Sequence, residues 1–137
     1  SSNKIENLNL NTFFSLRNLI VLKMNHNRIK TIKKISFFGL DNLKSLYLNS
    51  NSIESIEEEG FYGLFGLNEL VLSNNIIKLI NKRSFFGLVN LKKLDLESIF
   101  VESIEEKGFY DLHKLTELVL LRNKIKIIKK SYFFGLD

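Results

Sequence analysis

A repeat of 24 residues constrains this sequence more than any other feature. The spacing L-x-x-L-x-L-x-x-N-x-I-x-x-I-x-x-x-x-F-x-x-L-x-x begins at Leu19 and returns, with its register kept, at Leu43, Leu67, Leu91 and Leu115. Self-similarity at a fixed period of roughly 20 to 50 residues is typical of solenoids, in which each repeat is one coil stacked on its neighbours. The sequence therefore predicts one elongated repeat domain over residues 1–137.

The same register divides the chain into a partial repeat and five coils. The segments are 1–18, 19–42, 43–66, 67–90, 91–114 and 115–137. The first and last segments are incomplete and carry no capping motif, so we expect neighbouring repeats or caps of a longer chain. Without polar caps the isolated segment is expected to expose its terminal coils, and therefore to associate or fray.

The L-x-L step predicts a short strand in every coil, because two leucines point to one side and the residue between them to the other. A strand of this length needs partners, and stacked coils can pair their strands in parallel at about 4.8 Å. The inward leucines should then occupy equivalent interior places in mutual contact: Leu46, Leu70, Leu94 and Leu118. The later Ile, Phe and Leu positions line the wider side of each coil, so we expect an arc with the sheet on its concave face.

An asparagine follows the predicted strand in four of the five coils. Its amide carries two donors and an acceptor, which can satisfy backbone groups that the turn leaves unpaired. We therefore expect a structural ladder rather than a ligand site at Asn27, Asn51, Asn75 and Asn123.

This pattern resembles the typical leucine-rich repeat of Toll-like receptors, Slit proteins and small leucine-rich proteoglycans, and the resemblance covers essentially the whole chain. It implies an α/β-class horseshoe solenoid with parallel short strands on the concave face and irregular or short helical segments on the convex face. It also implies a recognition module, mostly secreted or at the cell surface. The shared motif residues are framework, so the resemblance transfers no site residue.

One coil departs from the pattern. Ile99 replaces the ladder asparagine and cannot hydrogen-bond the turn, so one or two backbone groups there are expected to need another partner, at a cost of roughly 1–3 kcal/mol if none is found. Drift in a redundant repeat explains the change. Alternatively, Phe100 and Ile76, which hold the same position in successive coils, form an apolar patch on the rim for a partner.

The charges alternate from coil to coil. Lys and Arg number 20 against 15 Asp and Glu, a net charge of +5. The twelfth repeat position reads Glu6, Lys30, Glu54, Lys78, Glu102 and Lys126. Stacking places neighbours about 5 Å apart, so we expect opposite charges to pair, contributing about 0.2–1 kcal/mol per exposed pair.

A second alternating set lies three or four positions further on: Lys33 and Lys34, Glu57 and Glu58, Lys82, Glu105 and Glu106, Lys129 and Lys130. Alternate repeats also share the most residues, which indicates a duplicated unit of 48 residues. A nucleic-acid footprint needs an uninterrupted basic stripe. The basic excess is therefore interpreted as solvated convex surface, with no nucleic-acid partner expected.

No catalytic or metal site is predicted. Cysteine is absent, and the two histidines, His26 and His113, fall on different sides of a coil. The serines have no neighbouring base, and the glycines of the repeated F-[FY]-G-L turn serve backbone geometry rather than phosphate binding. His26 lies on the sheet side, where a plain surface role is favoured over a pH sensor. We expect a protein that is not an enzyme and has no cofactor.

The outward positions of the predicted sheet are the candidate binding surface. The column between the two strand leucines reads Lys23, Tyr47, Val71, Asp95 and Val119. The preceding column contributes Glu69, Lys93 and Glu117, and the last coil adds Leu121 and Arg122. Apolar groups in an otherwise polar sheet are typical of protein-binding patches, although such residues also simply favour strands.

These features predict a ligand-binding module of a cell-surface or secreted receptor, with a protein or peptide ligand. The alternative is a structural or adhesive scaffold, or an intracellular protein-interaction scaffold, because no asparagine begins an N-x-[ST] sequon and no cysteine cap is present. The chain has no apolar run of about eighteen residues, so no membrane insertion is expected in this segment.

Overall fold

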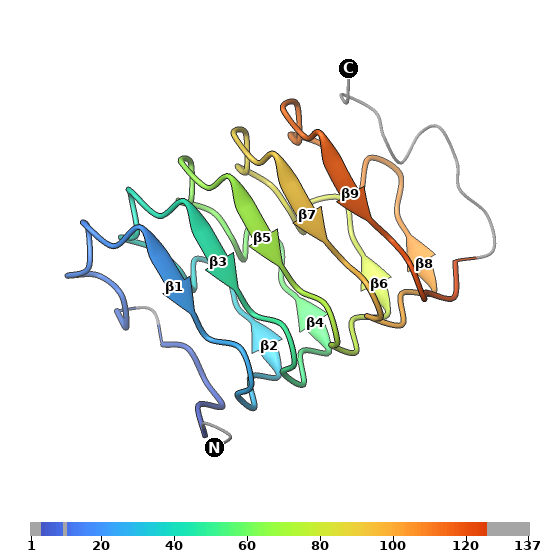
Figure 1. Cartoon of the computed structure of the whole chain (residues 1–137), viewed down its shortest axis with the longest axis horizontal. Coiled ribbons are helices and arrows are strands. Elements are labelled where there is room, and N and C mark those ends of the chain that lie inside the picture. The colour runs from blue at the N-terminus through green and yellow to red at the C-terminus, as the bar shows by residue number, and fades with distance from the viewer. Residues whose placement is uncertain (1–3, 10, 126–137) are drawn as a thin grey trace.

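The computed structural model describes residues 4–9 and 11–125, and over them the chain winds into a solenoid of stacked coils (Figure 1). Five three-residue strands form one parallel sheet in the order β1-β3-β5-β7-β9. They are β1 (Val21–Lys23), β3 (Ser45–Tyr47), β5 (Glu69–Val71), β7 (Lys93–Asp95) and β9 (Glu117–Val119). The sequence prediction of a parallel repeat solenoid is confirmed.

Four shorter strands lie on the return path of the coils. They are β2 (Thr31–Ile32), β4 (Ser55–Ile56), β6 (Leu79–Ile80) and β8 (Ser103–Ile104), and they pair in parallel as β2-β4 and β6-β8. Tight turns complete each coil, as where the Ser36 amide donates to the Lys33 carbonyl at 3.0 Å. In the described residues the convex side therefore consists of two-residue strands and tight turns. No helix in these residues is long and apolar enough to cross a membrane.

The strand register repeats the sequence period. Leu46 pairs with Leu70, Leu70 with Leu94, and Leu94 with Leu118. The first three are fully buried, and Leu118 is partly buried against the same core. The predicted equivalence of these leucines is confirmed, because in-register parallel pairing keeps one side of every strand facing inward.

A stack of phenylalanine rings fills the opposite side of the core. It contains Phe13, Phe37, Phe61, Phe85 and Phe109. Successive ring centroids are 5.7, 5.7, 6.2 and 6.1 Å apart with nearly parallel planes. These spacings exceed the strand spacing of about 4.8 Å. The phenylalanine side of each coil is therefore the wider side, as the predicted arc requires.

The turn after each buried phenylalanine needs a left-handed residue. Gly39 has φ 100°, and a Cβ added there would lie 2.9 Å from Phe14 Cα. Asp111 takes the equivalent place with φ 78°, and its carboxylate accepts a hydrogen bond from the Gly87 amide at 3.1 Å. Gly135 and the lysines at 126, 129 and 130 lie outside the described residues.

Candidate functional site: the outward face of the five-stranded sheet

We call the outward side of β1, β3, β5, β7 and β9, with the residues directly following each strand, the sheet face. In the three central strands the outward side chains are half-buried on either side of a buried leucine. This burial arises because each outward residue packs against its register partners in the coils before and after it. The columns predicted from the sequence thus become continuous rows of contacts across the coils.

A polar network crosses the centre of the sheet face. The Tyr47 hydroxyl donates to Glu69 Oε2 at 2.9 Å, and Lys93 Nζ lies 3.5 Å from Glu69 Oε1. The hydrogen bond to Glu69 raises the pKa of Tyr47, because it favours the protonated phenol. The negative charges of Glu117 and then Glu69 raise the pKa of Lys93. Four of the predicted residues, from β3, β5, β7 and β9, are thereby brought together.

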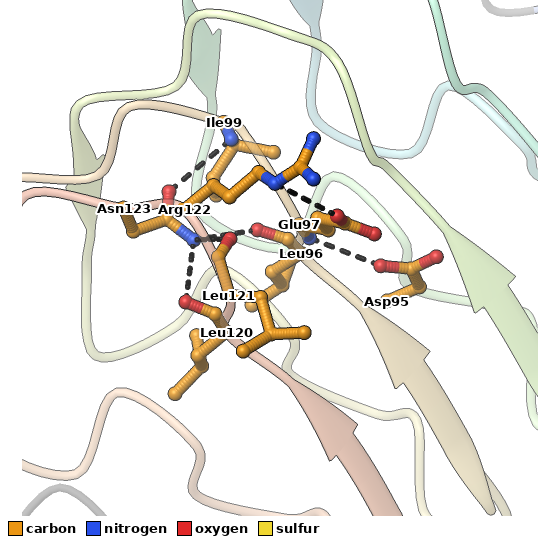
Figure 2. A network of polar contacts seen from close by, with 8 residues as sticks. All are labelled: Asp95, Leu96, Glu97, Ile99, Leu120, Leu121, Arg122 and Asn123. Carbon is orange, nitrogen blue, oxygen red and sulfur yellow. Dashed lines mark hydrogen bonds and ion pairs between the residues drawn. The ribbon is translucent and has the colours of Figure 1, made fainter.

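A second polar group lies where β7 and β9 end (Figure 2). Asp95 Oδ1 accepts from the Glu97 amide at 3.0 Å, and Arg122 Nε lies 3.7 Å from Glu97 Oε1. Leu121 is 66% exposed beside this pair. Glu97 was not among the predicted site residues, although its opposite charge next to Arg122 one coil later was a readable signal.

The predicted apolar residues of the sheet face do not form one patch. Val71 and Val119 are half-buried, but Asp95 stands between them as the register partner of both. Lys23 is exposed on β1, at the other end of the sheet from Leu121. The structure therefore presents a mixed surface in which carboxylates, two amines, a guanidinium and separated apolar groups alternate.

The residue before each ladder position bends the chain away from the sheet. It adopts a left-handed backbone, with φ between 53° and 58°, at His26, Ser50, Asn74, Ser98 and Arg122. No glycine stands at this position, so the sequence offers no simple signal for it. His26 is exposed there.

The ladder asparagines join successive coils through their amides. Asn75 Nδ2 donates to the Leu48 and Leu72 carbonyls at 3.0 and 2.9 Å, and its Oδ1 accepts from the Ile53 amide at 3.0 Å. Asn51 and Asn123 make the same donor pair within their own and the preceding coil. The Oδ1 of Asn27 accepts from the Ile5 amide at 3.1 Å. Each side-chain oxygen therefore serves the coil that precedes it.

The hydrogen bond that is lost because Ile99 replaces an asparagine is missing in a different coil from the one expected. Asn123 Oδ1 accepts from the Ile99 amide at 3.2 Å (Figure 2) and from the Val101 amide at 3.1 Å, so this turn keeps its partners. The Ile77 amide, one coil earlier, would donate to an asparagine at 99. It has no hydrogen bond in the part of the chain that the structure describes, and Ile77 is fully buried.

The two residues of the predicted rim patch are both accessible. Ile76 is 38% and Phe100 is 46% exposed. Phe100 has φ 61°, a left-handed conformation that is unusual for an aromatic residue. Lys124 Nζ lies 5.8 Å from the centre of its ring. The rim at this point thus combines exposed apolar surface with a cation.

The alternating charges pair in a different way from the one predicted. In the described residues no two side chains of the twelfth-position column form an ion pair within 4.0 Å, so the predicted pairing is wrong. The reason is that an exposed ion pair gains little energy in water and costs side-chain entropy. Glu59 instead bridges coils, contacting Arg83 and lying 3.4 Å from Lys34 Nζ. The hydrogen bond from Arg83 lowers the pKa of Glu59.

In the described part of the chain, no three His, Asp or Glu residues are placed so that they could hold a metal ion together. His113 Nε2 lies 3.7 Å from Asp111 Oδ1 on the turn side of the last complete coil, remote in sequence from His26. The arrangement on the sheet face is suited to recognition by charge and shape.

Comparison with known proteins agrees with this geometry. Three stretches match the leucine rich repeat family: residues 1–53, 41–98 and 90–137. Together these matches span the whole chain. No curated protein matches the chain significantly. The crystal structure of a TLR13–ssRNA13 complex is similar in fold, with a TM-score of 0.71, 24% identity, and coverage of 88% of this chain.

The chain spans 22% of the length of that solved chain, so the similarity concerns a stretch of its repeats. The repeat family and the solenoid fold are those of a ligand- or protein-binding module. On the sequence match and the stacked coils together, this chain belongs to the leucine-rich repeat family.

Proposed function

We propose that the sheet face binds a protein or peptide ligand, and that the chain forms part of the ectodomain of a cell-surface or secreted receptor. The observation that carries the proposal is a contrast between columns. Inward columns hold leucine in coil after coil, whereas the outward column from Lys23 to Val119 changes in size and charge at each step. A solenoid scaffold that displays varied residues on one broad face is suited to specific binding.

The chemistry of the sheet face favours a protein over a polyanion. Glu69, Asp95, Glu97 and Glu117 lie along the strands from β5 to β9 and oppose a phosphate backbone, whose binding depends on neutralising cations. Tyr47 supplies a fixed aromatic group, and Leu121 an exposed apolar one. Such combinations of aromatic, apolar and paired charged residues characterise protein interfaces. A ligand segment with basic and apolar side chains fits best.

The alternative function is a structural, adhesive or intracellular interaction scaffold. The absence of sequons and cysteines in these residues favours it. Sequence on either side of this segment distinguishes the two: a signal peptide, cysteine-rich caps and a membrane span support the receptor, and a cytosolic domain supports the scaffold.

Substitutions on the sheet face test the binding proposal. Peptides selected from a random display library on the wild-type chain are expected to lose at least about tenfold in affinity for Tyr47→Lys combined with Val71→Lys, because like charges and lost apolar contact act at the centre of the face. The matched control is Ser55→Lys with Leu79→Lys, which places the same charges on exposed positions of β4 and β6.

Circular dichroism confirms that both double variants remain folded. If the selected peptides bind the sheet-face variant as tightly as the wild type, or if the control variant loses affinity equally, the sheet face is not the binding surface. A single-stranded RNA oligonucleotide is titrated in parallel. Tight RNA binding that the sheet-face substitutions leave unaltered would place recognition elsewhere.

A further inference from the structure

A column of aromatic side chains, four of them exposed and Phe86 half-buried, runs along the turns on the return path of the coils. It consists of the residue after each buried phenylalanine, and we call it the outer aromatic column: Phe14, Phe38, Tyr62, Phe86 and Tyr110. Its rings stack where neighbours meet, with Phe14 and Phe38 centroids 6.4 Å apart and Tyr62 and Phe86 centroids 5.8 Å apart. Exposed apolar surface that recurs in successive coils is a candidate interaction site.

Charged rows of alternating sign accompany this column. One such row holds the sixteenth repeat position, which is Lys34, Glu58, Lys82 and Glu106 in four successive coils. All four are exposed; Lys34 pairs with Glu59, and the other three form no ion pair with another described residue. The row lies close to the column, because Arg83, which follows Lys82, has its guanidinium 3.9 Å from the centre of the Phe86 ring.

The two kinds of residue also line a common groove. Lys82, Arg83, Lys107 and Tyr110 enclose about 230 Å³ between two coils. One coil before this basic groove, the corresponding turn carries the acidic triplet Glu57, Glu58 and Glu59. The basic recess and the acidic triplet thus lie on neighbouring turns.

The order of the charges decides which partner fits. From coil 19–42 to coil 91–114 the row reads plus, minus, plus, minus. Read in the opposite direction, this order places a charge of opposite sign at every position. A two-fold axis can lie across this face between coils 43–66 and 67–90. It then places each charged residue of one copy opposite a residue of opposite charge in the second copy. It sets Glu58 against Lys82 of a second copy, and Lys34 against Glu106. A polyanion or polycation would instead meet repulsion at every second row.

We infer that this face is a two-fold contact between two copies of the chain. The same rotation places Tyr62 opposite Phe86, and Phe38 opposite Tyr110, so the aromatic column is also self-complementary, as an isologous interface requires. Four coils at a strand spacing of about 4.8 Å give a short contact, smaller than the roughly 800 Å² per partner of standard interfaces. Association is therefore weak and decreases with salt.

Charge exchange between variants tests this contact. Glu58→Lys places lysine against Lys82 of an identical copy, and Lys82→Glu places glutamate against Glu58. In sedimentation equilibrium at low salt, each variant alone is expected to self-associate at least about tenfold more weakly than the wild type. An equimolar mixture is expected to regain association, because in the mixed pair lysine meets glutamate at both contacts.

The control pair is Glu54→Lys and Lys78→Glu. These residues are exposed, unpaired within 4.0 Å in the described structure, and outside the proposed contact, and the substitutions change the net charge equally. They are expected to leave association unchanged. Association of the Glu58 and Lys82 variants at wild-type strength, or no recovery on mixing, overturns the inference. So does association that persists in high salt, which instead indicates stacking through the ends of the solenoid.

Discussion

At the scale of single residues, the ladder shows how one side chain serves two coils. Asn75 donates within its own coil and to the preceding coil, and its oxygen accepts an amide of the preceding coil. Replacing such a residue by isoleucine therefore removes a hydrogen-bond acceptor from an amide of the preceding coil. The sequence identifies the break at Ile99, but only the paired coils show that Ile77 loses its acceptor while Val101 keeps Asn123.

Amide hydrogen exchange tests this assignment. We expect the Ile77 amide to exchange at least about tenfold faster than the Ile53 amide, because Asn75 protects Ile53 and no hydrogen bond protects Ile77. Ile99→Asn should supply the missing acceptor and slow exchange at Ile77 selectively. Equal protection of the two amides in the wild-type chain would show that Ile77 has another partner.

At the scale of elements, strands of two and three residues persist only because neighbouring coils supply their partners. The buried side chains of each coil contribute the stability that isolated strands lack. In the turn after β2, Phe37 is fully buried in the ring stack, whereas the next residue, Phe38, is 44% exposed. Two adjacent, identical side chains thus differ mainly in burial.

Substitution of these two rings measures the contribution of the core stack. Phe37→Ala should lower the free energy of unfolding by about 3–5 kcal/mol, because it leaves a cavity between Phe13 and Phe61. Phe38→Ala, the control, should cost less than about 1 kcal/mol at its exposed position. Urea denaturation of both variants provides the comparison. Equal losses would mean that the stack contributes no more than the surface ring.

At the scale of the whole molecule, charge links coils across the stack. Glu59 contacts Lys34 in the preceding coil and Arg83 in the following one, so a single carboxylate joins three coils. Its pKa is lowered from 4.5, chiefly by the hydrogen bond from Arg83. A carboxylate with a lowered pKa stabilises the folded state above its unfolded pKa, and this contribution is lost as the pH falls through the folded value.

The pH dependence of unfolding tests this link. Glu59→Gln should be less stable than the wild type at neutral pH, and the difference should shrink as the pH falls below about 4.5. Glu54→Gln removes the same charge from an exposed residue that has no ion pair in the described part of the chain, and should show a smaller difference. A gap between wild type and Glu59→Gln that stays constant in acid would contradict the proposed coupling.

The sequence by itself determined the solenoid, its parallel register and its core. Leucines, isoleucines and phenylalanines at fixed 24-residue intervals leave Leu46 and Leu70 no common environment except the interior of stacked coils. Only the tertiary structure decided that Glu59 carries ion pairs that Glu54 does not, and that Tyr47, Glu69 and Lys93 form one network. The physical reason is that periodicity fixes which side a residue faces, whereas its partner depends on the direction and reach of side chains from different coils.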